Sequence, residues 1–286
     1  MISFDQLATC LDAVDCVAIT DDRSTWRAGT LGLAGGHIFG GQMIGQAITI
    51  AARLQPGHDV KSIHVAFPRG TRDTGTLDFQ ATTMHAGSTY GATRVEVSRP
   101  ERARPDRGGV DAVGFTAHVL HHRPGTGVEH QVDMPDVGAP DRARRVDLGL
   151  VPWDTRIVGG TDLDARRQQP NELMWWSRVD ADTSDAFATH QALLAFASEL
   201  TLIGTALLPH ERLSQLDAHV ALRTSVLTHS IRFHRRFRAD EWLLIAQSSP
   251  VATGGSAFGT GHVFTEAGEL VASFEQESMI RTEEAT

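Results

Sequence analysis

The spacing of apolar residues predicts one long helix in the first half of the chain. Apolar residues recur at helical intervals over Gln42 to Leu54, on one face of the predicted helix: Met43, Ala47, Ile50 and Leu54. The pair Gly40 and Gly41 precedes this helix, and Pro56 ends it. A short amphipathic segment and a strand-like stretch come before it, at 3–16 and 25–33, and four stretches with a β pattern follow, around 61–67, 76–84, 88–98 and 111–121. We therefore expect an antiparallel sheet wrapped around a helix.

The same order of elements returns in the second half. Between the halves, residues 123–170 lose all periodicity and are rich in proline and glycine, which is typical of a long connector. A strand is then predicted over 172–179 and a long helix over Asp185 to Leu208, with an apolar stripe formed by Leu193, Phe196, Leu200, Ile203 and Leu207. Four more β-type stretches follow, near 224–234, 241–249, 256–265 and 269–281.

Two short local matches indicate that the halves are copies of one unit. Residues 87–92 (GSTYGA) resemble residues 255–260 (GSAFGT), 168 positions later, and Phe67-Pro68-Arg69 resembles Phe233-His234-Arg235 at a spacing of 166. A nearly constant offset is typical of an internal duplication. We predict an α+β chain with an N-terminal repeat over 1–122, a connector over 123–170 and a C-terminal repeat over 171–286.

Composition excludes several classes of protein. A net charge of −9 and a single lysine, Lys61, argue against nucleic-acid binding, which needs a basic surface. No apolar run approaches the roughly 20 residues of a membrane span, and the N-terminus lacks the features of a secretory signal, so we expect a cytoplasmic protein. Cys10 and Cys16 have no partners at the spacing of a disulfide framework or a zinc site, and both are expected to be buried thiols.

A glutamine lies on the apolar face of the last predicted strand. Gln276 alternates in phase with apolar residues, namely Leu270, Ala272, Phe274 and Ile280. Aligning Phe274 with Phe115 places Ala117 at the equivalent position of the first repeat. A buried amide costs about 1–3 kcal/mol unless it is hydrogen-bonded. Gln276 therefore belongs to a polar network or bridges to a neighbouring backbone group, and the pattern alone favours the bridge.

A second candidate, Glu199, lies beside the apolar stripe of the long second helix. Partial burial raises the pKa of a carboxyl group towards the range that suits a general base. The alternative is an ordinary solvated glutamate on the flank of a helix.

Other sequence motifs limit the kinds of catalytic or binding site that the chain is expected to contain. The segment from Gly254 to Phe258 lacks the last glycine of a nucleophile elbow, and no Walker or dinucleotide fingerprint is present. We expect no metal site, because the histidines of one β-type stretch have no nearby carboxylate: His118, His121 and His122. A basic run fits either phosphate binding or an ordinary edge strand: Arg232, Arg235, Arg236 and Arg238.

Several dispersed motifs, in one order over nearly the whole chain, resemble type II acyl-CoA thioesterases. They are GHIFGGQ at 36–42, SIHVAF at 62–67, HSIRFHR at 229–235 with EWLL at 241–244, and LVAS at 270–273 followed by Gln276-Glu277. The resemblance implies a double hot-dog fold, in which curved antiparallel sheet wraps each helix. It also implies hydrolysis of fatty acyl-CoA by water, with no cofactor, metal or covalent intermediate.

In this family an aspartate, a serine or threonine, and a glutamine hold and activate that water. The glutamine corresponds to Gln276, and the aspartate corresponds to Glu199, which is one methylene longer. The hydroxyl position falls on Val226, so we expect Thr228, or else Ser225, to replace the missing group.

Substrate binding is assigned to three residues. Backbone N–H groups of Gly40 and Gly41 are candidate oxyanion donors, which requires the two halves to face each other, and Arg235 is a candidate for the CoA phosphates.

Two alternatives to hydrolysis stay open. The altered base and the lost hydroxyl fit an acyl-CoA-binding or regulatory protein with weak or no activity. A hot-dog hydratase would need an Asp and His pair at a helix start, where this chain has Gly40-Gly41-Gln42. By analogy we expect the two hot-dog units to pair within one chain, and the chain to form dimers or tetramers.

Overall fold

The computed structural model describes residues 15–31, 36–98, 113–181 and 183–282. Cys16 is buried as expected, whereas Cys10 and most of the predicted segment 3–16 lie outside the described residues. No helix of the described part is both long and apolar enough to cross a membrane.

All described strands form one antiparallel sheet. The strands of the first half are β1 (Val17–Ala18), β2 (Thr25–Gly29), β3 (Asp59–Ala66), β4 (Thr76–Ala86), β5 (Tyr90–Ser98) and β6 (Val113–His122). Those of the second half are β9 (Glu172–Arg178), β10 (Leu222–Phe233), β11 (Leu243–Thr253), β12 (Ser256–Thr265) and β13 (Leu270–Thr282). Each predicted β stretch of the two repeats therefore corresponds to a strand, within a few residues at its ends.

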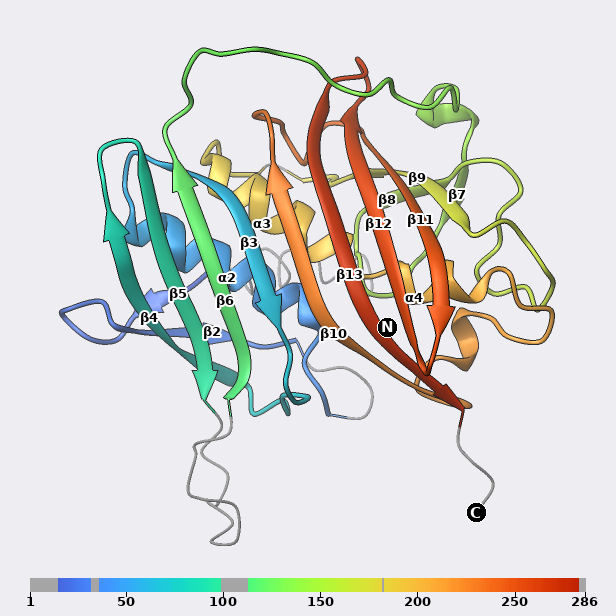
Figure 1. Cartoon of the computed structure of the whole chain (residues 1–286), viewed down its shortest axis with the longest axis horizontal. Helices are drawn as coiled ribbons and strands as arrows, with labels where there is room; N and C mark the ends of the chain where they lie inside the picture. Colours follow the sequence, from blue (N-terminus) through green and yellow to red (C-terminus); the bar gives the residue numbers. More distant parts are fainter. Residues whose placement is uncertain (1–14, 32–35, 99–112, 182, 283–286) are drawn as a thin grey trace, which may run out of the picture.

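The two halves join edge to edge at β3 and β10, in the centre of the sheet (Figure 1). The order β2-β4-β5-β6-β3 on one side is repeated in reverse as β10-β13-β12-β11-β9 on the other. Phe67 directly follows β3, and Phe233 is the last residue of β10. This symmetry confirms the double hot-dog architecture, with both units in one chain, while the repeat boundaries at 122 and 170 stay predictions.

Part of the predicted connector belongs to the sheet. Two strands, β7 (Arg144–Val146) and β8 (Asp154–Ile157), extend the sheet beyond β9, and a 3-10 helix, η3 (Pro140–Arg142), precedes them. Val151 and Trp153 are buried beside β8. The sequence pattern missed these strands because they are three and four residues long, too short for a period to show.

The helices lie on one face of the sheet. Helix α2 (Gly40–Leu54) and helix α3 (Phe187–Ser198) pack against each other behind the strands in Figure 1. The ring of Phe39, just before α2, meets the ring of Phe196 edge to face, with centroids 5.0 Å apart. A short helix, α4 (Leu202–Leu207), continues from α3, and η4 (Gln215–Asp217) follows it. The predicted helix over 185–208 is therefore interrupted at residues 199–201.

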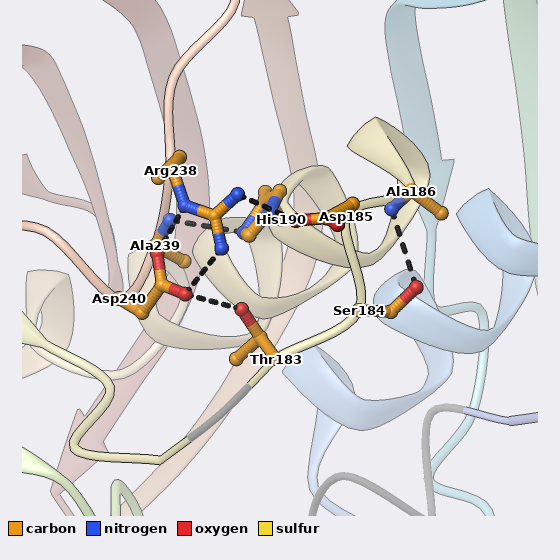
Figure 2. Close-up of polar contacts among 8 residues, drawn as sticks. All are labelled: Thr183, Ser184, Asp185, Ala186, His190, Arg238, Ala239 and Asp240. Atoms are coloured by element: carbon orange, nitrogen blue, oxygen red, sulfur yellow. Dashed lines mark hydrogen bonds and ion pairs between the residues drawn. The ribbon is translucent and has the colours of Figure 1, made fainter.

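A polar cluster fixes the start of α3 (Figure 2). Arg238 pairs with Asp185 at 2.9 Å and with Asp240 at 2.7 Å, and Asp240 also accepts a hydrogen bond from the hydroxyl of Thr183. The backbone N–H of Ala239 donates to Nδ1 of His190 on α3. These contacts tie α3 to the loop between β10 and β11, so the start of the helix is fixed relative to the sheet.

Candidate active site

The interruption between α3 and α4 carries Glu199. This residue follows the last residue of α3 and is only 6% exposed. Burial raises the pKa of its carboxyl group to about 8, because a charge is poorly solvated there, and a hydrogen bond from the backbone N–H of Gly41 opposes the shift. Glu199 is therefore a buried acid that ionises close to neutral pH, and not a solvated glutamate on a helix flank.

The N-terminus of α2 surrounds this carboxyl group. A methyl group at Gly40 would lie 2.8 Å from Oε1 of Glu199, and one at Gly41 would lie 2.4 Å from the carbonyl oxygen of Phe196. Only glycine lets the two helices approach this closely. The positive end of the α2 dipole then faces the carboxylate, which favours its charged form. The structure thus brings Gly40 and Gly41 of the first half to Glu199 of the second half.

Gln276 lies in a buried chain of hydrogen bonds that runs from β13 through β10 to α3. Its Oε1 is 3.0 Å from Nδ1 of His229, and Nε2 of His229 is 3.0 Å from the hydroxyl of Ser198. Nε2 of Gln276 donates to the hydroxyl oxygen of Ser278 at 3.0 Å. Of the two roles left open for Gln276, the structure supports the polar network.

The protonation of His229 follows from its partners. An amide oxygen only accepts, so Nδ1 of His229 carries the proton that it donates to Gln276. The Ser198 hydroxyl lies 3.0 Å from both the carbonyl oxygen of Ala195 and Nε2 of His229, and its one proton serves one of these acceptors at a time. Burial lowers the pKa of His229 to about 4, and the hydrogen bond to Gln276 opposes this shift. The imidazole is therefore neutral near pH 7 and holds the Gln276 amide in one orientation.

Gln276 and its cross-strand neighbours pack next to the residues that flank Glu199. His229 and Gly259 are the cross-strand neighbours of Gln276 on either side. His229 reaches Ser198, directly before Glu199, and a methyl group at Gly259 would lie 2.6 Å from Leu202, three residues after it. Among the hydrogen bonds of the described residues, none joins Glu199 directly to Gln276.

Comparison with protein families identifies the chain. A family described as an acyl-CoA thioesterase N-terminal domain matches residues 29–121, and one described as acyl-CoA thioesterase matches residues 152–279. The chain belongs to the acyl-CoA thioesterase family. Among relatives, the thioesterase is 27% identical to acyl-CoA thioesterase 2 of Haemophilus influenzae, over 87% of this chain and 89% of that protein. It is 26% identical to acyl-coenzyme A thioesterase 8 of Homo sapiens, over 86% of this chain and 81% of that protein.

Solved structures agree with this assignment. An acyl-CoA thioesterase II from Mycobacterium marinum is 28% identical to the thioesterase and superimposes with a TM-score of 0.79, covering 97% of this chain and all of that one. A hot-dog protein of unknown function from Alicyclobacillus acidocaldarius is 15% identical and superimposes with a TM-score of 0.69, covering 96% of this chain and 98% of that one. At this identity the likeness supports the fold alone.

Thr228 does not join Glu199 and Gln276 in the thioesterase. The register between β10 and β13 shifts between Val226 and Thr228, so Leu227 forms a bulge and the side chains beyond it change face. Thr228 lies opposite Glu277 and donates to its carboxylate at 3.1 Å. Placing Thr228 on the face of Val226 was wrong because the sequence does not reveal the bulge.

The other hydroxyl and the arginines have partners elsewhere. Ser225 donates to the carbonyl of Val226. Arg235 lies beyond the end of β10 and donates to the carbonyl of Leu270 at 2.9 Å, and three further arginines form ion pairs: Arg232 with Glu275, Arg236 with Asp59, and Arg238 with Asp240. Contact between Arg235 and CoA phosphates stays a prediction. Among the described residues, no cluster of His, Cys, Asp or Glu forms a candidate metal site.

Sequence reasoning missed three residues of this site: Ser198, His229 and Ser278. Each is a polar residue at a buried position, and the alternation of apolar residues along the strands marks two of them. His229 and Ser278 alternate in phase with apolar residues of their strands, as Gln276 does.

Proposed function

We propose that this thioesterase hydrolyses fatty acyl-CoA to a free acid and CoA, with Glu199 as the general base and Gln276 as the group that orients the attacking water. The observation that carries the proposal is the buried carboxyl group of Glu199, held at the N-terminus of α2 with its pKa raised to about 8. A base with a pKa near the working pH combines a useful deprotonated fraction with a strong affinity for the proton.

The reaction needs neither a metal nor a covalent intermediate. Glu199 takes one proton from water as the water oxygen attacks the thioester carbonyl, and the carbon–sulfur bond then breaks to release CoA as its thiolate. The thiolate recovers a proton from Glu199 or from solvent. Oriented N–H groups stabilise the negative oxygen that develops on the carbonyl.

The N-terminus of α2 is the source of such a donor. The first N–H groups of a helix have no partner within it. Gly41 already donates to Glu199, so we assign the oxyanion contact to the N–H of Gly40. The sequence gave this one role to Gly40 and Gly41 together.

Thiol release from a panel of acyl-CoAs tests the proposal. Glu199→Gln keeps the size of the side chain but cannot accept the proton, and we expect kcat to fall by about 10²- to 10⁴-fold. Gln276→Ala is expected to lower kcat as well. Glu277→Gln is the matched control, since Glu277 neighbours Gln276 on β13 but is exposed on the other face. Thermal denaturation verifies that each variant is folded.

A wild-type protein that binds acyl-CoA but releases no thiol would contradict hydrolysis and favour the binding or regulatory alternative. Cytoplasmic location and assembly into dimers or tetramers stay predictions, which fractionation and light scattering test.

A further inference from the structure

The hydroxyl of Ser278 lies in the proposed active site. Ser278 is on the inner face of β13, two residues after Gln276, and is 3% exposed. Its oxygen accepts a hydrogen bond from Nε2 of Gln276 at 3.0 Å. Across the sheet its neighbours are Val226 on β10 and Ala257 on β12, so this hydroxyl lies between two apolar side chains.

The proton of this hydroxyl has no acceptor among the hydrogen bonds of the described residues. A serine hydroxyl has one donor and two acceptor sites, and Gln276 occupies only one acceptor site. The nearby cluster is apolar and contains Ile203, Leu207, Leu222, Val226 and Ile280. Because an unpaired buried polar group is costly, a hydroxyl in such surroundings points to a partner that arrives with the substrate.

We propose that Ser278 is a catalytic residue of this thioesterase, which donates its hydroxyl proton in a hydrogen bond to the oxygen of the attacking water. The proposal rests on the hydrolysis argued above. Gln276 holds the Ser278 oxygen in place, and His229 holds Gln276, so the hydroxyl proton is left free to donate to another group. No bond to Ser278 is made or broken: Glu199 takes the proton from water, and Ser278 keeps its own.

The pairing of Ser278 with Val226 explains how a hydroxyl on β13 can take the place of one on β10. Val226 stands where the family pattern has a serine or threonine, and Ser278 is its direct cross-strand partner. Side chains of such partners start about 4.5–5.5 Å apart on the same face. A hydroxyl on either strand therefore reaches the same space, and we infer that Ser278 replaces the group that Val226 lacks.

Reciprocal substitution tests this interchange, with thiol release as the readout. Ser278→Ala is expected to lower kcat by about 10- to 100-fold, the range for loss of one strong hydrogen bond, with little change in KM. Adding Val226→Thr to Ser278→Ala is expected to return kcat to within about threefold of wild type. Ser230→Ala is the matched control, because Ser230 pairs with His64 outside the core.

Three results would overturn the proposal, and they separate it from the function itself. If Ser278→Ala keeps wild-type kcat while Glu199→Gln is impaired, Ser278 is not catalytic but hydrolysis stands. If the folded double variant is no faster than Ser278→Ala, the two positions are not interchangeable. If wild type releases no thiol from any acyl-CoA, both the function and the role of Ser278 fail.

Discussion

The backbone N–H of Gly41 donates a hydrogen bond to the buried carboxyl group of Glu199. Gly41 belongs to the first helix of one half and Glu199 to the helix break of the other, so neither half alone contains the proposed active site. Burial favours the neutral acid, whereas the Gly41 N–H and the α2 dipole favour the anion. Burial is the larger effect, and the pKa therefore lies above its ordinary value.

The pH dependence of hydrolysis follows from this balance. Glu199 must be deprotonated to accept a proton, and with a pKa of about 8 it is roughly one-tenth deprotonated at pH 7. We expect kcat/KM to rise about tenfold per pH unit below pH 8 and to level off above it. Rates of thiol release between pH 6 and 9.5 measure this. Gln276→Ala should lower the plateau without moving the midpoint, and a flat wild-type profile would contradict the assignment of Glu199.

Glu199 also links folding stability to pH. Its pKa is raised from 4.5 to about 8 in the folded protein, so between these values the folded state holds a proton that the unfolded state has lost. Stability from this group is present below about pH 4.5 and is lost as pH rises to about 8. This pH-dependent loss is absent in Glu199→Gln. The Tm of the variant minus the Tm of wild type should therefore increase between pH 5 and 8.5. A constant difference in Tm would contradict the raised pKa.

The two glycines of α2 predict different defects. In Gly40→Ala the new methyl group meets the end of the flexible Glu199 side chain, so we expect lower kcat with little loss of Tm. In Gly41→Ala it meets the backbone carbonyl of Phe196, and we expect a loss of about 1–3 kcal/mol in the free energy of unfolding. Gly160→Ala, in open space, is the control. Equal stabilities for the two variants would argue against this packing.

His229 is expected to act through Gln276. His229→Phe keeps a ring next to Phe274 but removes both hydrogen bonds, which frees the amide to rotate. We expect kcat to fall by about 10- to 100-fold, with KM nearly unchanged and the pH midpoint still set by Glu199. His234→Phe, at an exposed histidine, is the control. Wild-type kcat in folded His229→Phe would show that Gln276 needs no anchor.

Thr228→Val should leave hydrolysis within about twofold of wild type. The Thr228 hydroxyl pairs with the carboxylate of Glu277, away from Gln276, and surface interactions of this kind contribute little to stability. Steady-state thiol release tests this. A loss as large as that expected for Ser278→Ala would show that β10 takes up another register in solution.

The fold could be read from local patterns. The 3.6-residue period of 42–54 and the period of two in the strands report which side chains are buried, and burial is what forms the layers. The helix break escaped prediction because the apolar stripe runs on through Leu200 and Ile203 without a proline or glycine at 199–201 to mark it.

The sequence by itself determined the order of elements, the apolar setting of Gln276 and the candidate carboxylate Glu199, because each depends on neighbours along the chain. Only the tertiary structure decided that Gly41 meets Glu199, that Thr228 turns away and that Ser278 lies opposite Val226. These depend on the register between strands, where one bulged residue reverses the face of every side chain beyond it. The partner strand sets that register, and local periodicity does not encode it.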